Sequence, residues 1–520
     1  MHSSRSLRCA PSRLRPIFIL AVGSFVYGLI TVTTISEKHA FYMPMARFWE
    51  IAVGGCVAAV ERRWGLVHKV SDLMAILGLL AIAAAVTLLE SSSGGQQWAV
   101  VAVLGTAAVI AAGAPSRSVI AAALGSRPMV GIGRISYSMY LVHWPLIVFW
   151  RLCVARPLVP HEQVLILILT IGLAAALSAF VETPMRAGSR QIGNKPALAG
   201  ILTASTVVAA LGTAVILDRG AVWRMSPTAR EALATLRAGV AERPRCIADK
   251  QWLGPGFSVC RWNAEVGGTD FVIWGDSHAG ALGPELARVL GNGGKRSGVS
   301  VGIPGCSPVV SIVVAGRKYS RICPVFVDAV IKAIAREKPK IVVIAARWAI
   351  LASDVPAAGD GQRTGRILDL ENNRTPMRLA DALSRTLERV HASGGQVVLV
   401  GPVPEIDYDV PPTLVRSLHG IGRLRPVRRA DFDMRQAQVL SALAKIQASG
   451  NVSVVYPHTV LCNAETCAVA DGIRSLYMDD DHLSPFGSAR VSWLVRSAID
   501  WAEKMQDKPG TTAIAEPDYR

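Results

Sequence analysis

A serine follows directly on an apolar run that has the length of a buried strand. The run 271–274 leads into Gly-Asp-Ser-His at 275–278. The serine is therefore expected on a sharp turn at the carboxyl end of a strand, where open α/β sheets place their ligands and chemistry. Much later in the chain comes Asp-Asp-Asp-His at 479–482. A serine on a strand-end turn and a late Asp-x-x-His are the parts of a Ser-His-Asp hydrolase or acyl-transfer site.

Each side chain of such a site has an expected role. Ser277 is a poor nucleophile at its ordinary pKa and needs a base, which we assign to His482. A carboxylate must orient the imidazole, and the spacing alone does not separate Asp479 from Asp481. The amide of Ser277 is the natural first donor to an acyl oxyanion. The rest of the first motif is expected to hold the turn rather than to do chemistry: Gly275, Asp276 and His278.

Strands and helices alternate along the second half of the chain. The expected strands lie at 270–275, 298–303, 340–346, 396–401 and 452–456. The expected helices lie at 279–291, 324–337, 376–393, 433–449 and 485–505. Alternation at this spacing argues for a three-layer α/β domain with a doubly wound, mainly parallel sheet. We expect this domain at 246–505, followed by a disordered tail at 506–520.

The first 217 residues have a different composition. The overall hydrophobic share of 51% mixes apolar runs in this half with an ordinary globular half. Seven segments are long and apolar enough to span a membrane. They lie at 16–34, 45–61, 72–90, 97–114, 134–152, 163–181 and 197–217. We expect a polar, largely helical linker at 218–245 between these spans and the α/β domain.

Two independent patterns place the α/β domain outside the cytoplasm. Lys and Arg gather in the N-terminal tail and in every second joint, which puts the N-terminus of a multi-pass inner-membrane protein in the cytoplasm. Seven spans then put the α/β domain in the periplasm. Its six cysteines form near-neighbour pairs, which indicates three disulfides in an oxidising compartment, the alternative being six unrelated thiols. The pairs are Cys246–Cys260, Cys306–Cys323 and Cys462–Cys467.

The charge and the cysteine spacing also bear on partners. The formal net charge is +17, but the topology explains much of this excess, so nucleic acid is not an expected partner. The membrane bilayer is an expected partner. No cysteine pair has Cys-x-x-Cys spacing with a matching second half, so a zinc site is not expected.

Three ionisable residues lie within or beside the expected spans. Arg47 and Glu50 are one helical turn apart and can pair on one face, and His143 lies in the fifth span. Ionisable groups at membrane depth usually face a cavity or a partner, which makes these residues a candidate membrane-domain site. The plain alternative is that Arg47 snorkels to the interface and His143 is an interfacial histidine.

Three motifs carry a resemblance to a known family. They are Phe-Tyr-x-Pro-x-x-Arg-Phe-Trp-Glu at 41–50, Gly-Arg-Ile-Ser-Tyr-Ser-Met-Tyr-Leu-Val-His-Trp-Pro at 133–145 and Val-Glu-Thr-Pro-Met-Arg at 181–186. These resemble the later helices of the acyltransferase family 3 membrane proteins, in the arrangement where that domain is fused to a periplasmic SGNH domain. The resemblance covers about 1–217 and 240–500. It implies O-acetylation of an envelope glycan such as lipopolysaccharide, with acetyl-CoA as the acyl donor and no bound cofactor.

The resemblance also refines the site. The family pattern Asp-x-x-His selects Asp479 as the carboxylate that orients His482. Gly305 matches the family's oxyanion glycine loosely. Arg347 and Trp348 stand where classical SGNH enzymes have an asparagine, as in the fused subfamily. These three residues are expected to shape the oxyanion or acceptor site.

The chain departs from the family pattern at its start. The family's membrane domain has more helices than the seven spans seen here, and its first helix carries an Arg and a His used in acyl transfer. The span at 16–34 has no His. We therefore expect 1–217 to be a partial acyltransferase domain, from a fragment, a misread start or a degenerate copy, in which case a partner subunit would complete it.

Three functions remain open on the sequence. The first is an O-acyltransferase that passes an acyl group from Ser277 to an envelope polysaccharide. The second is a membrane-tethered carbohydrate esterase, because water and a sugar hydroxyl compete for the same acyl-enzyme. The third is a truncated, non-catalytic remnant.

Overall fold

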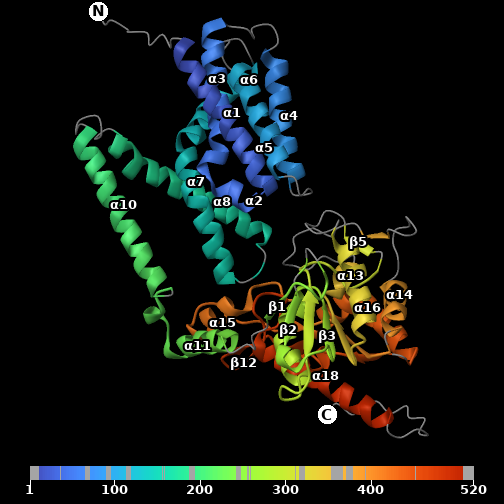
Figure 1. The fold of residues 1–520 in the computed structure, drawn as a ribbon. Coiled ribbons are helices and arrows are strands. Elements are labelled where there is room, and N and C mark those ends of the chain that lie inside the picture. The colour runs from blue at the N-terminus through green and yellow to red at the C-terminus, as the bar shows by residue number, and fades with distance from the viewer. Residues whose placement is uncertain are drawn as a thin grey trace, which may run out of the picture. The chain divides into compact units, whose positions relative to one another are not determined.

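The structure is a computed structural model and divides into two compact units (Figure 1). It describes residues 11–34, 37–64, 71–89, 95–112, 119–154, 156, 158–186, 194–218, 220–241, 247–254, 257, 259–310, 312–314, 322–352, 367–369, 379–392, 394–450 and 452–506. The first unit comprises Met1–His143 and Ile168–Met185, and the second comprises Trp144–Leu167 and Arg186–Arg520. The expected tail therefore lies outside the described residues apart from its first position.

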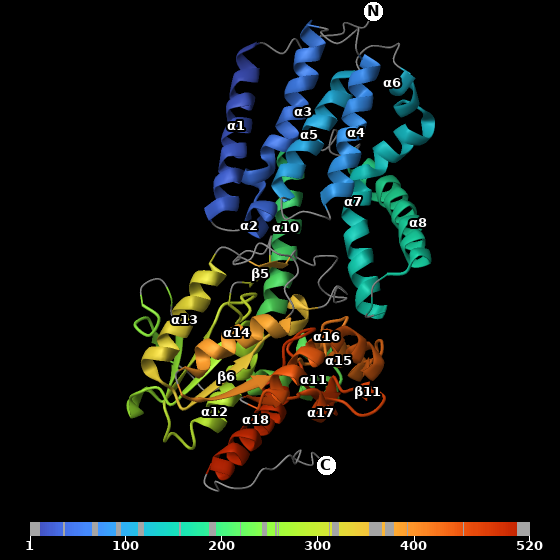
Figure 2. The same ribbon diagram turned by 90° about the vertical axis from the view of Figure 1, so that its right-hand side faces the viewer.

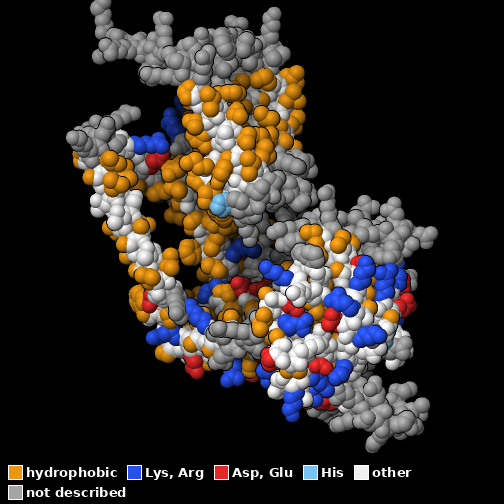
Figure 3. All heavy atoms as spheres, viewed as in Figure 1, with side chains coloured by type: hydrophobic (Ala, Val, Ile, Leu, Met, Phe, Trp, Pro, Cys, Tyr) orange, Lys and Arg blue, Asp and Glu red, His pale blue; other side chains and the backbone are white. Residues whose placement is uncertain are grey.

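The first unit is helical. Its helices are α1 (Pro11–Thr34), α2 (Glu37–Tyr42), α3 (Pro44–Trp64), α4 (Ser71–Leu89), α5 (Gly95–Ala112), α6 (Val119–Leu124), part of α7 (Arg127–Val154), the end of α8 (Pro160–Leu177) and the π-helical turn η1 (Ser178–Glu182). Helices α4 and α5 pack closely, since a Cβ on Gly78 would lie 2.6 Å from the carbonyl oxygen of Gly105. Hydrophobic side chains cover much of the outer face of this unit (Figure 3).

Each predicted span falls on a helix, but only two helices are long and apolar enough to cross a membrane among the residues the structure describes. They are Pro160–Arg186 and Leu198–Leu217, the second within α10 (Asn194–Leu217). Shorter apolar helices cover Pro16–Val32, Asp72–Thr87 and Ala99–Ala112. The other predicted spans fall short for two physical reasons. The apolar parts of α1, α4 and α5 are short, and α3 and α7 carry charged side chains within their length.

The second unit contains a seven-stranded sheet in the order β1-β2-β4-β3-β6-β8-β10. The five parallel strands are β4 (Gly298–Gly302), β3 (Phe271–Gly275), β6 (Ile341–Ala345), β8 (Gln396–Val400) and β10 (Ser453–Val455). All five were predicted from the sequence. Two short antiparallel strands, β1 (Ile247–Asp249) and β2 (Val259–Trp262), extend one edge and were not predicted.

Helices cover both faces of this sheet (Figure 2). One face packs on α12 (Ser277–Leu290) and α18 (Pro485–Gln506) through a core that includes Ile273, Val343 and Val398. The other face packs on α13 (Cys323–Glu337), α14 (Leu379–His391) and α16 (Arg429–Ala448). Because both faces are covered, the central strands are apolar at nearly every position, as in other parallel sheets. The predicted three-layer α/β domain is confirmed.

The expected linker contains a helix that docks on the α/β domain. Helix α11 (Pro227–Ala241) is preceded by Ser226, whose hydroxyl donates to the carbonyl of Leu418 (3.1 Å) and whose amide donates to Nδ1 of His419 (3.0 Å). Both partners lie at the end of α15 (Val410–Leu418). The linker is thus helical, as predicted, and its helix packs as part of the domain.

Two of the three predicted disulfides are present. Cys306 is bonded to Cys323, and Cys462 to Cys467. Cys260 is also disulfide-bonded, while its expected partner Cys246 lies outside the described residues, so that pairing stays a prediction.

Candidate active site

The serine motif forms a tight junction between β3 and α12. Strand β3 ends at Gly275 and α12 begins at Ser277. A Cβ on Gly275 would lie 1.7 Å from the carbonyl oxygen of Ala345 in β6, so only glycine fits there. Ser277 is half-buried at the first position of the helix, where its amide belongs to the positive end of the helix dipole. The predicted strand-end position of the serine is confirmed.

Asp276 fixes this turn with both carboxylate oxygens. Its Oδ1 accepts the amide N–H of His278 at 2.9 Å and caps α12. Its Oδ2 accepts the amide N–H of Arg347 at 3.0 Å, which ties the turn to the segment after β6. Asp276 is 3% exposed, so these bonds satisfy a buried charge. The expectation that Asp276 holds the turn agrees with this geometry.

His482 lies between two carboxylates and beside the start of α12. Its Nδ1 is 2.8 Å from Oδ2 of Asp479 and 2.6 Å from Oδ1 of Asp481. Its ring centroid is 4.9 Å from that of His278, the residue after the serine. Nε2 of His482 is buried and has no hydrogen-bond partner within the described ranges. The ring nitrogen that would face a nucleophile is therefore not engaged by another group of the described residues.

The two carboxylates are held differently. Asp479 keeps 42% of its side chain exposed, and its Oδ1 accepts the amides of Asp481 (3.0 Å) and His482 (2.7 Å). Asp481 is only 8% exposed, and its Oδ2 lies 3.1 Å from Nη1 of Arg347. The sequence left these two residues open on spacing alone, and the structure brings both onto the same imidazole nitrogen.

This arrangement shifts the protonation of the histidine. Burial alone would lower the pKa of His482, but its hydrogen bonds with Asp479 and Asp481 raise it to about 10. Burial would likewise raise the pKa of Asp481, but its interactions with His278 and His482 and the charge of Arg347 hold it well below its usual range. The imidazolium and the carboxylates stabilise one another's charged forms.

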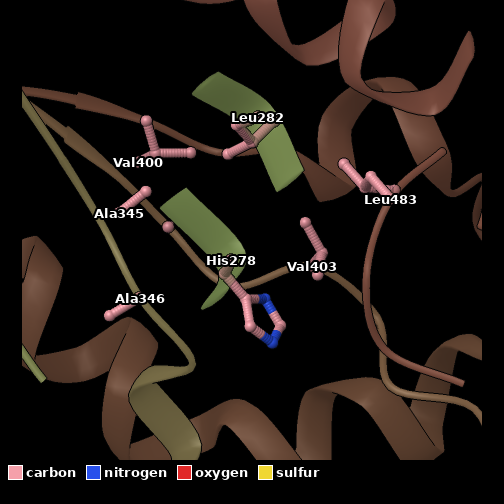
Figure 4. A pocket seen from close by; sticks show the side chains of 8 residues that line it. His278, Leu282, Ala345, Ala346, Val400, Val403 and Leu483 are labelled. Carbon is pink, nitrogen blue, oxygen red and sulfur yellow. The ribbon is translucent and has the colours of Figure 1, made fainter. Parts of the chain in front are cut away.

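His278 does more than hold the turn. Its Nε2 is buried and lies 3.5 Å from Oδ2 of Asp481, without a hydrogen-bond partner among the described residues. Its side chain lines a small cavity of about 10 Å³ (Figure 4), the lower limit for one water molecule. Its other lining residues are apolar and come from α12, from the carboxyl ends of β6 and β8 with the segments that follow them, and from the loop before α18: Leu282, Ala345, Ala346, Val400, Gly401, Val403 and Leu483.

Arg347 and Trp348 follow β6 and make their polar contacts inside the protein. Trp348 is fully buried, and its Nε1 donates to the carbonyl of Val400 at 2.8 Å. Arg347 is 13% exposed and binds Asp481 and Glu405. Both side chains are thus engaged inside the protein, and their role in shaping an acceptor site stays a prediction. Gly305 follows β4 in a turn that requires positive φ (78°), and its oxyanion role stays a prediction.

A network of buried charges extends from Asp481, and the sequence reading missed it. Glu405 accepts from Nε of Arg347 and from Nε of Arg435, each at 3.0 Å, and its side chain is 7% exposed. Glu405 comes just after β8 and Arg435 lies within α16. A sequence signal existed for Glu405, since a charged residue at a strand's carboxyl end is expected near a site. None existed for Arg435, which lies in a helix of mixed polarity.

The membrane-domain residues lie in the first unit and at its edge. Arg47 and Glu50 form the predicted pair, with Nε–Oε1 and Nη2–Oε2 both 3.0 Å. The guanidinium also lies 4.8 Å from the centroid of the Phe41 ring. Nδ1 of His143 lies 2.8 Å from the carbonyl oxygen of Tyr140, one turn earlier in α7. The pairing is confirmed, and a catalytic use of these residues stays a prediction.

Known proteins share both halves of this architecture. Residues 245–496 match the SGNH domain that is fused to AT3 domains, and residues 7–179 match an acyltransferase domain. The O-acetyltransferase OatA of Staphylococcus aureus (strain NCTC 8325 / PS 47) is 32% identical over 186 residues, which is 33% of this chain and 30% of that protein. The match therefore spans less than a third of that relative's length.

Two solved structures align with the chain at low similarity. The periplasmic domain of a lipopolysaccharide acetyltransferase from Salmonella ser. Paratyphi A shares 16% identity with a TM-score of 0.36, covering 54% of this chain and 100% of that one. A putative acylhydrolase from Bacteroides fragilis NCTC 9343 shares 15% identity with a TM-score of 0.25, covering 46% of this chain and 93% of that one.

The fold and the site define an α/β domain of the SGNH class, with its serine at the end of the central strand β3. The chain belongs to the family in which an acyltransferase family 3 domain is joined to such an SGNH domain. The predicted combination of an acyltransferase domain with an SGNH domain is confirmed.

Proposed function

We propose that the chain is an O-acyltransferase of an envelope glycan, in which Ser277 carries the acyl group before it reaches a sugar hydroxyl. The observation that carries this proposal is the position of His482. It lies beside the start of α12, with Nδ1 held by carboxylates and Nε2 free of protein partners in the described part of the chain. Carboxylates that orient the imidazole and an unengaged Nε2 support this role. Nε2 and Ser277 Oγ do not form a hydrogen bond in this structure, so the nucleophile and its base have to approach each other when the substrate binds.

The chemistry has two halves. Ser277 Oγ attacks the acyl carbonyl carbon while its proton passes to Nε2 of His482, and the donor's leaving group then departs with that proton. A sugar hydroxyl next attacks the acyl-serine, giving its proton to His482, and Ser277 Oγ leaves and takes the proton back. The oxyanion of each tetrahedral intermediate is placed near the amide of Ser277 at the positive end of α12.

The helical half has a matching role in this proposal. It is a multi-pass inner-membrane domain that delivers the acyl group outward from acetyl-CoA, with the N-terminus in the cytoplasm and the SGNH domain in the periplasm. The disulfides Cys306–Cys323 and Cys462–Cys467 support an oxidising compartment. Alkaline phosphatase fused after residue 506 should be active in cells, because that reporter folds only in the periplasm. An inactive but intact fusion would contradict this topology.

The first experiment removes the nucleophile. Ser277→Ala should abolish glycan acetylation in cells that depend on this chain, as measured by release of acetate from purified glycan. Ser449→Ala is the matched control, because Ser449 is exposed at the end of α16 and far along the chain from the motif. Acetylation that survives in the Ser277 variant at the control's level contradicts the proposal and favours a non-catalytic remnant.

A second experiment separates transfer from hydrolysis. The full chain in detergent is given an acetyl ester donor, with and without a soluble glycan, and both free acetate and acetylated sugar are quantified. Acetylated sugar that increases with glycan concentration supports the transferase. Release of acetate alone, unchanged by glycan, identifies an esterase.

A further inference from the structure

Asp481 is a buried carboxylate that contacts three side chains of the site. Its Oδ1 lies 2.6 Å from Nδ1 of His482, and its Oδ2 lies 3.1 Å from Nη1 of Arg347 and 3.5 Å from Nε2 of His278. Its side chain is 8% exposed, whereas that of Asp479 is 42% exposed. A charge in a less hydrated place is less screened, so Asp481 acts on the imidazole in addition to the more exposed Asp479, and the pKa of His482 is raised by both.

The buried network fixes the direction in which Asp481 points. Arg347 binds Asp481 with Nη1 and Glu405 with Nε, and Glu405 is bound in turn by Arg435. The four side chains are each 13% exposed or less. Asp479, by contrast, is held by amides of its own loop. Asp481 is thus held by Arg347, which follows strand β6, and Asp479 is held by the loop that carries His482.

We propose that Asp481, clamped by Arg347 and shared with His278, is a second positioning residue for His482 that acts alongside Asp479. The inference rests on the proposed function, because it assumes that His482 serves Ser277. The imidazole has one proton on Nδ1 and two acceptors within 2.8 Å of it. Asp481 therefore sets the basicity of His482, and with it the pH at which Ser277 becomes reactive.

The electrostatics agree with the geometry. The hydrogen bonds from both carboxylates overcome the effect of burial and raise the pKa of His482 to about 10. A histidine base works only in its neutral form, so the reactivity of Ser277 should rise with pH up to this value. The charged and titratable groups that act on His482, directly or through its carboxylates and their partners, come from five segments of the domain: Tyr477, Asp479, Asp480 and Asp481 on its own loop, His278 at α12, Arg347 after β6, Glu405 and Asp409 after β8, and Arg435 on α16.

The test measures the pH dependence of Ser277 labelling by a fluorophosphonate probe on the full chain in detergent, between about pH 6 and pH 11. For the native chain, the labelling rate should rise about tenfold per pH unit and level off near pH 10. Asp481→Asn removes one counter-charge from the imidazole and should move that plateau down by about one to three pH units. Asp480→Asn is the matched control: it makes the same charge change one residue away, and it should leave the plateau in place.

Asp479→Asn provides a test that does not depend on the folding of an Asp481 variant. Because Asp479 is partly exposed and Asp481 remains, the plateau should stay above pH 6.5, the ordinary value for histidine. A plateau well below 6.5 in this variant overturns the inference, since burial alone lowers the pKa of the imidazole and Asp481 would then not offset it. Equal plateaus for folded Asp481→Asn and the native chain also overturn it. If Ser277 of the native chain is not labelled at any pH, the proposed function fails instead.

Discussion

Glu405 holds two arginines inside the α/β domain, and its neutralisation should destabilise the fold measurably. Its carboxylate oxygens accept from Nε of Arg347 and Nε of Arg435, both at 3.0 Å, and all three side chains are 13% exposed or less. Glu405→Gln keeps the size and shape of the side chain. It removes the negative charge that both guanidinium groups face, so the loss is electrostatic rather than one of packing.

The size of the effect follows from the burial. Removing one partner of a buried ion pair costs about 3–5 kcal/mol, and the lower end applies because Arg347 keeps Asp481. A domain of this size loses about 2–4 °C in Tm per kcal/mol. We therefore expect Glu405→Gln to lower the Tm of the α/β domain by about 6–12 °C.

The control is an ion pair on the surface of the same domain. Asp431 pairs with Arg428 on α16, and the two side chains are 43% and 76% exposed. Asp431→Asn should leave the Tm close to that of the native chain, because solvent screens exposed pairs. Thermal unfolding of the full chain in detergent, followed by tryptophan fluorescence, compares both variants. A Tm for Glu405→Gln within about 2 °C of the control would refute the reasoning that this network is a buried support.

Two further predictions concern the fold around the site. Gly275→Ala should abolish expression of folded protein, because its Cβ would lie 1.7 Å from a strand carbonyl. Gly280→Ala, whose Cβ meets nothing within 4 Å, is the control and should fold normally. Equal yields of the two variants would contradict the close strand contact. Burial and the charge of Arg429 lower the pKa of His458 to about 4. Between pH 4 and 6.5 this histidine therefore binds a proton in the unfolded state but not in the folded state. The free energy of unfolding should be at its full value above about pH 6.5 and fall as the pH drops toward 4. His458→Phe should remove this part of the pH dependence of Tm, and an unchanged slope between pH 6.5 and 4 would show that another group is responsible.

The central sheet could be predicted because its strands carry a strong local signal. Runs such as 341–345 and 396–400 are apolar at nearly every position, which only a sheet covered on both faces requires. Strands β1 and β2 were missed because they are three and four residues long and half-exposed. Their pairing depends on the edge that β4 offers, which is a tertiary effect that no short window contains.

The site was predictable to the extent that its residues are close in sequence or follow a strand. Ser277 and His482 were found from their local motifs. The way Asp481 is held could not be predicted, because it depends on burial and on Arg347, which lies far away in the chain. The sequence spacing showed which carboxylates can reach the imidazole of His482. The ion pairs of Arg347, Glu405 and Arg435 determine how Asp481 is held.

Helix α11 limits how far the SGNH domain can travel from the end of α10. Since α11 docks on the domain through Ser226, only residues 218–226 join it to Leu217. A segment of this length spans at most about 30 Å even when extended. Under the proposed function, Ser277 is therefore tethered within a limited distance of the end of α10, and tethering of this kind gives local concentrations in the millimolar range. Delivery to Ser277 would then depend on reorientation of a tethered domain rather than on diffusion of a free partner.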